Sequence, residues 1–161
     1  MDELDATDIA ILRELQKNAK LTIKELALSV HRSPTPVFER VKYLEKNGYI
    51  RQYIAVLDAE KLNKGFCVFC NVKLMQHSRE NGKKFKDAIL AIDEVCECYN
   101  ISGDFDFLLK VRVPDMKHYQ NFVLNKLGEI NAIGSLQSIF VMSEIKQEYG
   151  IPLSNDDKPT K

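Results

Sequence analysis

The residues with the clearest potential for chemistry lie between His31 and Lys46, where basic, hydroxyl and acidic side chains recur at helical spacing. A helix that begins at Ser33-Pro34 and turns about 100° per residue buries one stripe and exposes the opposite one. The buried stripe is predicted to be Val37, Val41 and Leu44, and the exposed side chains Thr35, Glu39, Lys42 and Lys46, with Pro36 and Tyr43 on the flank. Threonine and glutamate can contact base edges in a major groove, and lysine and tyrosine can contact phosphates. This stretch therefore predicts a DNA-binding helix.

The local charge supports the same interpretation. The chain has 23 basic and 23 acidic side chains and is neutral as a whole, yet residues 17–52 carry a net charge of +5. A local basic patch is sufficient to engage phosphates. The alternative is a solvated helix face held by salt bridges, and Arg40 could brace the helix against Glu45 or the first helix. The predicted DNA-binding residues are His31, Arg32, Ser33, Thr35, Pro36, Glu39, Arg40, Lys42 and Tyr43.

A second group of candidate residues lies at Gly103-Asp104-Phe105-Asp106, directly after a strand-like run. A free amino acid needs acceptors for its ammonium group, donors for its carboxylate and a pocket for its side chain. Backbone N–H groups and two carboxylates in one turn could meet the first two needs. The alternative is that Gly-Asp only makes a hairpin turn and that both acids are solvated. Spacing alone favours this simpler alternative.

The four cysteines form two close pairs, Cys67 with Cys70 and Cys96 with Cys98, which resemble a divided metal site. Cys67 and Cys70 lie on a predicted strand, however, where a spacing of three points them to opposite faces. No glycine-containing turn lies between them. We therefore predict buried strand thiols and no metal site.

Three short helices are predicted to position the basic face. The first covers roughly residues 5–17, with Asp5 as its N-cap. The second starts at Thr22, whose spacing from Glu25 is that of a capping box. The third runs from Ser33 to a glycine after residue 47 that can take a left-handed conformation.

The gap between the second and third helices is only two residues, which is typical of a helix-turn-helix. We predict a helix-turn-helix (winged-helix-like) domain over residues 1–50, with the motif itself at about 23–42. A linker strand and hinge are predicted over 51–65, because the β-rich segment Tyr49–Leu57 is followed by a polar stretch that ends in glycine.

The remainder of the chain alternates strand-like and helical patterns. Its predicted elements are strand Phe66–Leu74, helix Arg79–Ile92, strand Val95–Ser102, strand Phe107–Val113, a helix from Asp115 to about Leu127, and strand Leu136–Ile145. The order βαββαβ is that of a ferredoxin-like fold. The fold class is therefore α+β, with a ferredoxin-like domain over residues 66–150 and a polar tail over 151–161.

Composition excludes several other classes of protein. The neutral balance excludes a polybasic tail binder and a strongly acidic solvating chain. No apolar run approaches the ~18 residues that span a bilayer. The acidic start at residues 1–5 lacks the basic flank and apolar stretch of a signal peptide. We therefore expect a cytoplasmic protein with no membrane partner and with reduced cysteines.

Four motifs in order carry a family resemblance. They are Leu4-Asp5-x-x-Asp8-x-x-Ile11-Leu12-x-x-Leu15-Gln16, Ser33-Pro34-Thr35-Pro36-x-x-Glu39-Arg40-Val41-x-x-Leu44-Glu45, Ser102-Gly103-Asp104-Phe105-Asp106 and Val113-Pro114-Asp115-Met116. Together they resemble the leucine-responsive regulator and AsnC (Lrp/AsnC) family of transcription regulators. The resemblance covers about residues 4–149 and is greatest to the leucine-responsive type.

This resemblance implies a DNA-binding N-terminal domain and a ferredoxin-like domain that binds amino acids. It also implies a homodimer that assembles further, to an octamer or similar. The effector-facing residues that it implies are Ser102, Gly103, Asp104, Phe105, Asp106, Met116, Ile139, Phe140 and Val141. The last four could instead serve core or dimer packing. Their apolar character favours a leucine- or methionine-like effector, and no other cofactor is expected.

His31 and Arg32 stand where the family usually has glycine and an apolar residue. Histidine tolerates a left-handed backbone better than most residues, so the turn can still form. Two other functions stay open: a ligand-binding adaptor without DNA binding, and an enzyme that resembles the sirohaem decarboxylases, which use histidines around a tetrapyrrole. The chain has only three histidines, and its motif at 33–45 is intact. We therefore predict a transcription regulator and not an enzyme.

Overall fold

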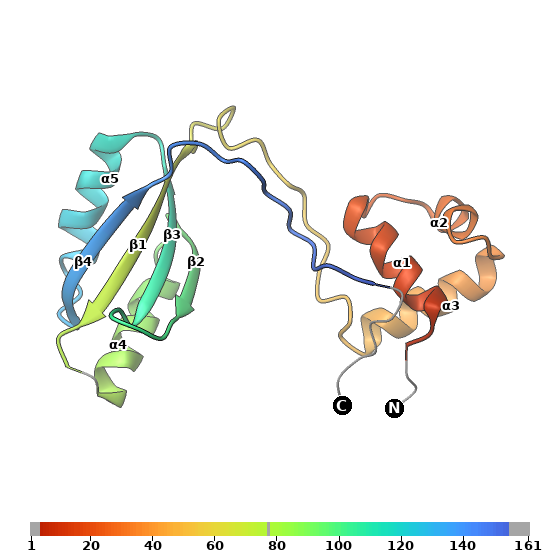
Figure 1. Ribbon diagram of the computed structural model, residues 1–161, viewed down its shortest axis with the longest axis horizontal. Coiled ribbons are helices and arrows are strands. Elements are labelled where there is room, and N and C mark those ends of the chain that lie inside the picture. The colour runs from red at the N-terminus through yellow and green to blue at the C-terminus, as the bar shows by residue number, and fades with distance from the viewer. Residues whose placement is uncertain (1–3, 77, 155–161) are drawn as a thin grey trace. The chain divides into compact units, whose positions relative to one another are not determined.

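The computed structural model describes residues 4–76 and 78–154 of the chain. These residues form two compact units (Figure 1). The first, which we call the helical unit, contains the residues up to Val56 together with those from Lys146 onwards. The second, the sheet unit, contains Leu57–Ile145. No helix in the described part of the chain is long and apolar enough to cross a membrane.

The helical unit contains three helices, α1 (Ala6–Lys17), α2 (Ile23–Ser29) and α3 (Pro34–Lys46). Their bounds agree with the sequence prediction to within the fraying expected at helix ends. The core consists of Ile11, Leu26, Ala27, Val37, Val41 and Leu44. The three core residues from α3 are the predicted buried stripe, so hydrophobic spacing alone oriented this helix correctly.

Side chains cap α1 and α2 as predicted. The carboxylate of Asp5 accepts hydrogen bonds from the N–H groups of Thr7 and Asp8, and the Asp8 carboxylate accepts one from the Asp5 N–H at 3.0 Å. Thr22 and Glu25 form a second capping box at the start of α2. Each box satisfies N–H groups that the start of a helix leaves without partners.

The β-rich segment 49–57 forms no strand, so the prediction of a linker strand there was wrong. Among the described residues its backbone forms no strand ladder with another segment. A strand exists only through hydrogen bonds to a neighbour, whatever the β-propensity of its residues. Tyr53, Ile54, Val56 and Leu57 are consequently exposed.

Residues 151–153 lie along α1, although they are distant from it in sequence. Arg13 donates a hydrogen bond to the Leu153 carbonyl at 3.0 Å. The side chain of Gln16 accepts one from the Ile151 N–H at 2.7 Å and donates one to the Ile151 carbonyl at 3.2 Å. This segment thus belongs to the helical unit, whereas the sequence predicted a polar tail over 151–161. Residues 155–161 of that tail lie outside the described residues.

The sheet unit has the predicted element order βαββαβ. Its elements are β1 (Phe66–Leu74), α4 (Arg79–Leu90), β2 (Val95–Asn100), β3 (Phe107–Val113), α5 (Met116–Phe122), which continues as a π-helical turn (Val123–Leu127), and β4 (Ile133–Phe140). All neighbouring strands are antiparallel, in the order β2-β3-β1-β4 (Figure 1). This is the ferredoxin-like arrangement.

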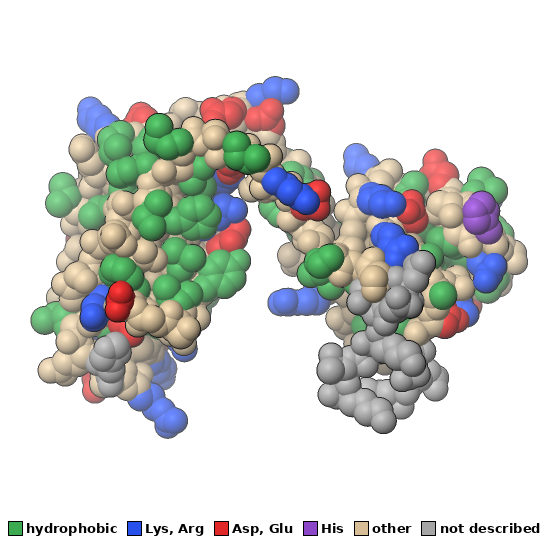
Figure 2. All heavy atoms as spheres, in the orientation of Figure 1, with side chains coloured by type: hydrophobic (Ala, Val, Ile, Leu, Met, Phe, Trp, Pro, Cys, Tyr) green, Lys and Arg blue, Asp and Glu red, His purple; other side chains and the backbone are tan. Residues whose placement is uncertain are grey.

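The two faces of this sheet have different surroundings. Val68, Val72 and Leu109 belong to the core, with Phe85 of α4 and Phe122 of α5. Successive strand side chains point to opposite faces, so the residues between them point away from the helices. We call that second side of the sheet the open face. Hydrophobic side chains gather over the sheet in the view of Figure 2.

The last strand differs most from the prediction, which placed it at Leu136–Ile145. It begins earlier because an irregularity next to Leu74 lets the ladder reach Ile133. Its pairing with β1 ends at Phe140, opposite Val68, and one further hydrogen bond joins the Val141 N–H to the Cys67 carbonyl near the start of β1. The apolar residues that follow Val141 are therefore left without a ladder.

Only one of the two cysteine pairs is buried. Cys67 and Cys70 are buried on β1, as predicted, and burial raises the pKa of each thiol. Cys96 and Cys98 are exposed, so the prediction of buried thiols was wrong for this pair. Both lie on β2, an edge strand that has a neighbour on one side only in the described sheet. No cluster of metal-ligating side chains occurs within the described residues.

Candidate DNA-binding face and effector loop

A left-handed turn joins α2 to α3. His31 has a φ of 52°, a conformation that histidine tolerates better than most residues with a side chain. The His31 N–H donates to the Leu28 carbonyl at 3.2 Å, and the Arg32 N–H donates to the Ala27 carbonyl at 2.9 Å. This pair of hydrogen bonds is a Schellman motif. The predicted turn therefore forms, and the side chains of His31 and Arg32 are both exposed.

The exposed face of α3 agrees with the prediction. Its exposed side chains include Thr35, Glu39, Lys42 and Lys46. Tyr43 is half-buried on the flank, where its ring stacks on Tyr49 with centroids 6.4 Å apart. The helix thus presents hydroxyl, carboxylate and ammonium groups on one side. Such groups can contact base edges in a major groove and the phosphates beside it.

The start of α3 offers less to a phosphate than an ordinary helix start. Pro34 and Pro36 have no N–H groups, which leaves the Thr35 N–H as the one donor among the first three helical residues. Ser33 occupies the N-cap position, but its side chain makes no capping hydrogen bond. A helix N-terminus ordinarily attracts phosphate. At the start of α3 this attraction depends on the Thr35 amide and the Ser33 hydroxyl.

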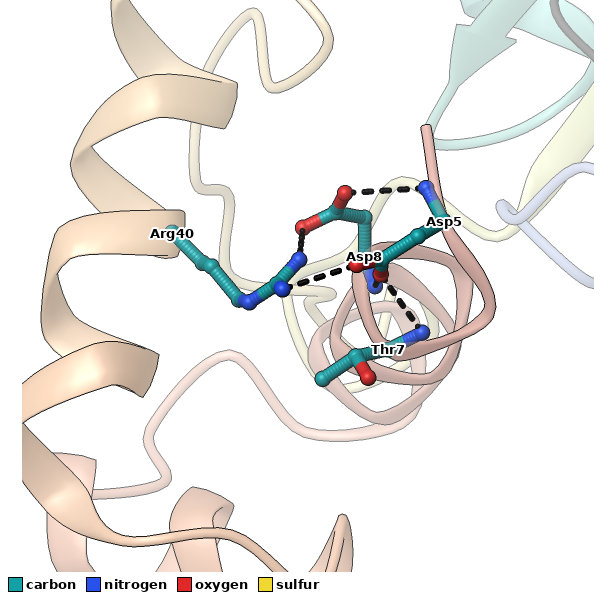
Figure 3. A network of polar contacts seen from close by, with 4 residues as sticks. All are labelled: Asp5, Thr7, Asp8 and Arg40. Atoms are coloured by element: carbon teal, nitrogen blue, oxygen red, sulfur yellow. Dashed lines mark hydrogen bonds and ion pairs between the residues drawn. The ribbon is translucent and has the colours of Figure 1, made fainter. Parts of the chain in front are cut away.

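Arg40 points from α3 to the start of α1 (Figure 3). Its guanidinium lies 2.7 Å from the carboxylate of Asp5 and 2.7 Å from that of Asp8. Asp8 is only 6% exposed, so the pairing compensates a carboxylate that has little access to water. Of the two roles predicted for Arg40, the structure shows the bracing one, with α1 as the partner instead of Glu45. Its contact with DNA stays a prediction.

This network shifts the pKa values of Asp5 and Arg40. Partial burial acts to raise the pKa of Asp5, but hydrogen bonds from the Asp8 N–H and the Arg40 guanidinium outweigh it and hold that pKa below its ordinary value. The hydrogen bond to Asp8 is the chief reason why the pKa of Arg40 is raised. Asp5 and Arg40 are therefore both charged at neutral pH.

In the sheet unit, the loop between β2 and β3 carries the first part of the predicted effector set. Gly103 has a φ of 121°, a backbone conformation that only glycine adopts without strain. Ser102 and Asp104 are exposed, and Phe105 is half-buried. The Asp104 carboxylate is thus accessible to a ligand.

Asp106 is tied to the end of β1. Its carboxylate accepts a hydrogen bond from the Leu74 N–H at 2.7 Å, and its own N–H donates to the Val72 carbonyl at 2.9 Å. Its carbonyl accepts hydrogen bonds from the Ile101 N–H at 3.0 Å and from the Asn100 side chain at 2.7 Å. These contacts give Asp106 a positioning role for the loop, and a direct contact with an effector stays a prediction.

The two parts of the predicted effector set lie at opposite ends of the sheet. The loop over 102–106 adjoins the Leu74 end of β1, whereas Val141 is bonded to Cys67 at the other end. These ends are about 23 Å apart along β1, at about 3.3 Å per residue. The second part of the set lies towards the Cys67 end and consists of Met116, Ile139, Phe140 and Val141.

The second part of the set is itself divided between the two faces of the sheet. Phe140 packs against Tyr119 of α5, with ring centroids 5.6 Å apart, and so lies on the helix-covered side. Ile139, the preceding strand residue, points to the open face and is 47% exposed. One copy of the chain therefore does not bring all the predicted effector residues into one pocket.

Both units match models of known domains. Residues 4–51 match a winged helix-turn-helix DNA-binding domain, and residues 67–151 match the Lrp/AsnC ligand binding domain. The leucine-responsive regulatory protein of Haemophilus influenzae is 42% identical over 144 residues, which are 89% of this chain and 87% of that protein. Its Escherichia coli counterpart is 38% identical over 145 residues, or 90% and 88% of the two chains. The chain belongs to the Lrp/AsnC family.

Solved structures of similar proteins share the fold over nearly the whole chain. A transcriptional regulator of Neisseria meningitidis in complex with L-methionine has a TM-score of 0.90 and 37% identity, covering 92% of this chain and 96% of the other. An AsnC family regulator of Agrobacterium tumefaciens has a TM-score of 0.88 and 37% identity, covering 92% and 97%. As an Lrp/AsnC protein, the chain is a transcription regulator with a DNA-binding and an amino-acid-binding domain. The curated relatives are named as regulatory proteins, not as enzymes.

The sequence prediction for this Lrp/AsnC regulator did not include Phe38, an exposed residue on α3. Phe38 is 40% exposed, and the Lys42 ammonium lies 4.2 Å from the centre of its ring. A lysine over an aromatic face is a cation–π contact. The sequence did contain a signal for this contact. Phe38 and Lys42 are four residues apart, so their side chains are neighbours on a helix.

Proposed function

We propose that this Lrp/AsnC regulator binds operator DNA as a homodimer, with α3 of each copy in the major groove. The observation that carries the proposal is the exposed polar face of α3, preceded by a turn that exposes Arg32. Thr35 and Glu39 contact base edges, while Arg32 and Lys42 contact phosphates. A two-fold dimer places its two recognition helices about one DNA turn apart. Because the partner is genomic DNA, we expect the protein to work in the cytoplasm.

The open face of the sheet supports the homodimer. It carries the apolar or aromatic side chains Phe69, Tyr99, Leu108 and Ile139. Tyr99 and Ile139 are 51% and 47% exposed in a single copy, and an exposed apolar patch is characteristic of an interface. A second copy related by two-fold symmetry offers the same face in return. Further assembly, to an octamer or similar, would use other surfaces of the sheet unit.

The separation of the two effector groups supports a shared binding pocket. The loop over 102–106 and the residues near Val141 are about 23 Å apart along β1 in one copy, which is too far for one amino acid to bridge. We infer that the loop of one copy meets the Met116 end of another. Asp104 accepts hydrogen bonds from the effector ammonium.

The apolar residues at that end suit a leucine- or methionine-like side chain. Met116 is 41% exposed and so has surface to offer a ligand, whereas Ile139 lies on the open face that we assign to the dimer. Burial of such side chains against an effector favours apolar amino acids over polar ones. The Neisseria meningitidis regulator, whose structure contains L-methionine, supports this class of effector.

Selection of bound duplexes from a random-sequence pool, with and without L-methionine or L-leucine, tests the DNA-binding function. We expect a two-fold symmetric operator to be enriched. Arg32→Ala and Lys42→Ala should weaken binding to it, each reducing the salt dependence by about one released counterion. The matched control is Lys20→Ala, which removes an exposed lysine from the loop between α1 and α2 and should change neither quantity.

The alternatives make different predictions in the same experiment. A ligand-binding adaptor would enrich no sequence at moderate salt and would be indifferent to Arg32→Ala. The enzyme alternative has little support from the histidines. His31 lies in the turn before α3, His118 bonds to Asp115 at the start of α5 at 2.8 Å, and His77 lies outside the described residues.

A further inference from the structure

Phe38 is an exposed aromatic residue on the DNA-binding helix, and the ammonium group of Lys42 lies over its ring. Phe38 lies beside the buried Val37 but outside the core of the helical unit, and 40% of it is exposed. The ammonium of Lys42, one helical turn later, is 4.2 Å from the ring centre. Thr35 and Glu39 are exposed on the same helix.

This combination restricts the chemistry of a partner. An exposed ring gains free energy by covering an apolar group, and the lysine beside it favours an anionic neighbourhood. Few surfaces provide an apolar group within an array of negative charge. The major groove of DNA does so at thymine, whose C5-methyl group projects into the groove between the phosphate backbones.

We propose that Phe38 recognises thymine, with the edge of its ring packed against a C5-methyl group while Lys42 contacts a neighbouring phosphate. Lys42 lies over one face of the ring, which leaves the edge for the base. The proposal rests on insertion of α3 into the major groove and adds to it a contact that reads sequence. Phe38 is therefore a specificity-determining residue, whereas Lys42 contributes affinity to any sequence.

The test replaces each thymidine of the selected operator by deoxyuridine, which lacks only the methyl group and pairs identically. Loss of one buried methyl group corresponds to about fourfold weaker binding, by the usual free energy of burying a methylene. We expect this loss at one thymine, or two adjacent ones, in each half-site. Phe38→Ala should bind the unmodified operator more weakly and lose its sensitivity at those positions. Phe38→Leu, which keeps an apolar side chain, should retain most of that sensitivity.

The controls separate this proposal from the DNA-binding function on which it rests. If Phe38→Ala shows the same deoxyuridine penalties as the natural chain, Phe38 does not recognise thymine, although the protein still binds its operator. If no deoxyuridine substitution weakens binding of the natural chain, the proposal also fails, and this arm needs no protein variant to fold. If Phe38→Ala instead dissociates the dimer without changing the penalties, the ring serves a protein contact. If no operator is enriched at all, the proposed function fails together with this inference.

Discussion

His31 and Gly48 occupy equivalent positions in two turns of the same type. Each follows the last turn of a helix, and in the second turn the Gly48 and Tyr49 N–H groups donate to the carbonyls of Glu45 and Leu44. The φ angles are 52° for His31 and 76° for Gly48. Glycine adopts such angles without steric cost, whereas a residue with a Cβ atom is strained. The helical unit therefore holds strain in the turn that precedes α3.

We expect His31→Gly to raise the free energy of unfolding of the helical unit by about 1 kcal/mol, because it relieves a left-handed strain of that order. The matched variant Gly48→Ala should lower it by about 1 kcal/mol. Apart from its neighbours in the chain, no atom of the described residues lies within 4 Å of a Cβ placed on Gly48, so that loss is conformational and not steric. Urea denaturation followed by circular dichroism measures both. Destabilisation by His31→Gly would show that the imidazole has a stabilising contact that outweighs the strain.

The gain in stability should come with a loss of function. If His31 touches the DNA backbone as predicted, His31→Gly weakens operator binding while it stabilises the fold. Stability and binding commonly change in opposite directions when a strained residue at a binding site is replaced. Gly48→Ala, at the far end of α3, provides the comparison for effects of stability alone.

At the scale of elements, the ion pairs of Arg40 with Asp5 and Asp8, which we call the clamp, join α1 to α3. They add to the packing of the three-helix core. Asp5 and Asp8 cap α1, and Arg40 binds both carboxylates at once. The helices α1 and α3, which α2 separates in sequence, are thus joined at the residues that begin and cap α1. A change at Arg40 should consequently disturb both the cap and the angle of α3.

We expect Arg40→Met to destabilise the helical unit by about 1–2 kcal/mol, a value reduced from that of a buried pair because the guanidinium is partly exposed. Methionine keeps an apolar stem, so lost packing contributes little. Thermal denaturation at pH 7 gives the stability. An operator affinity that falls only in proportion to the unfolded fraction would contradict the predicted contact of Arg40 with DNA. A larger fall would fit either that contact or a changed angle of α3.

The same clamp predicts a dependence on acid. The pKa of Asp5 is lower in the folded state than its ordinary value, so its contribution to stability is complete above that ordinary value. The contribution is lost as pH falls through the folded pKa, when the carboxylate takes up a proton. Arg40→Met should therefore lose less stability than the natural chain as the pH falls below the ordinary aspartate pKa of about 4.

Helices of this chain were predicted well from sequence, and strands less well, for a physical reason. The caps at Asp5 and Thr22 and the buried stripe of α3 depend on residues within one or two turns. The segment 49–57 and the end of β4 have strong β-propensity but lack a partner strand in one copy. Ladder hydrogen bonds to a distant segment decide where a strand begins and ends, and no local pattern contains that information.

The candidate site shows the same limit at the scale of the whole molecule. The exposed face of α3 follows from helical geometry, and the family resemblance supplied the loop over 102–106. Neither indicated that Asp106 is bound by the end of β1, or that Met116 lies at the opposite end of the sheet from the loop. The partner of Arg40 was likewise ambiguous, because Asp8 is 32 residues away in sequence.

A shared effector pocket can be tested by mixing two defective variants. Asp104→Ala alters the loop and Met116→Glu alters the other end of the sheet, and we expect each variant alone to bind L-methionine more weakly. In mixed assemblies some sites combine the intact loop of one copy with the intact end of another. Isothermal titration should then show recovery of a fraction of tight sites. A pocket contained within one chain would show no recovery on mixing.

The hydrogen bonds between Gln16 and Ile151 have a consequence for the order in which the protein is made. The ribosome synthesises the whole sheet unit between the three helices and the segment that lies along α1. The helices can pack as soon as they emerge, but their last contacts arrive only after residues 57–145 have been translated. A nascent chain interrupted in the sheet unit would therefore present a DNA-binding unit that lacks its final support, and full stability is reserved for the completed polypeptide.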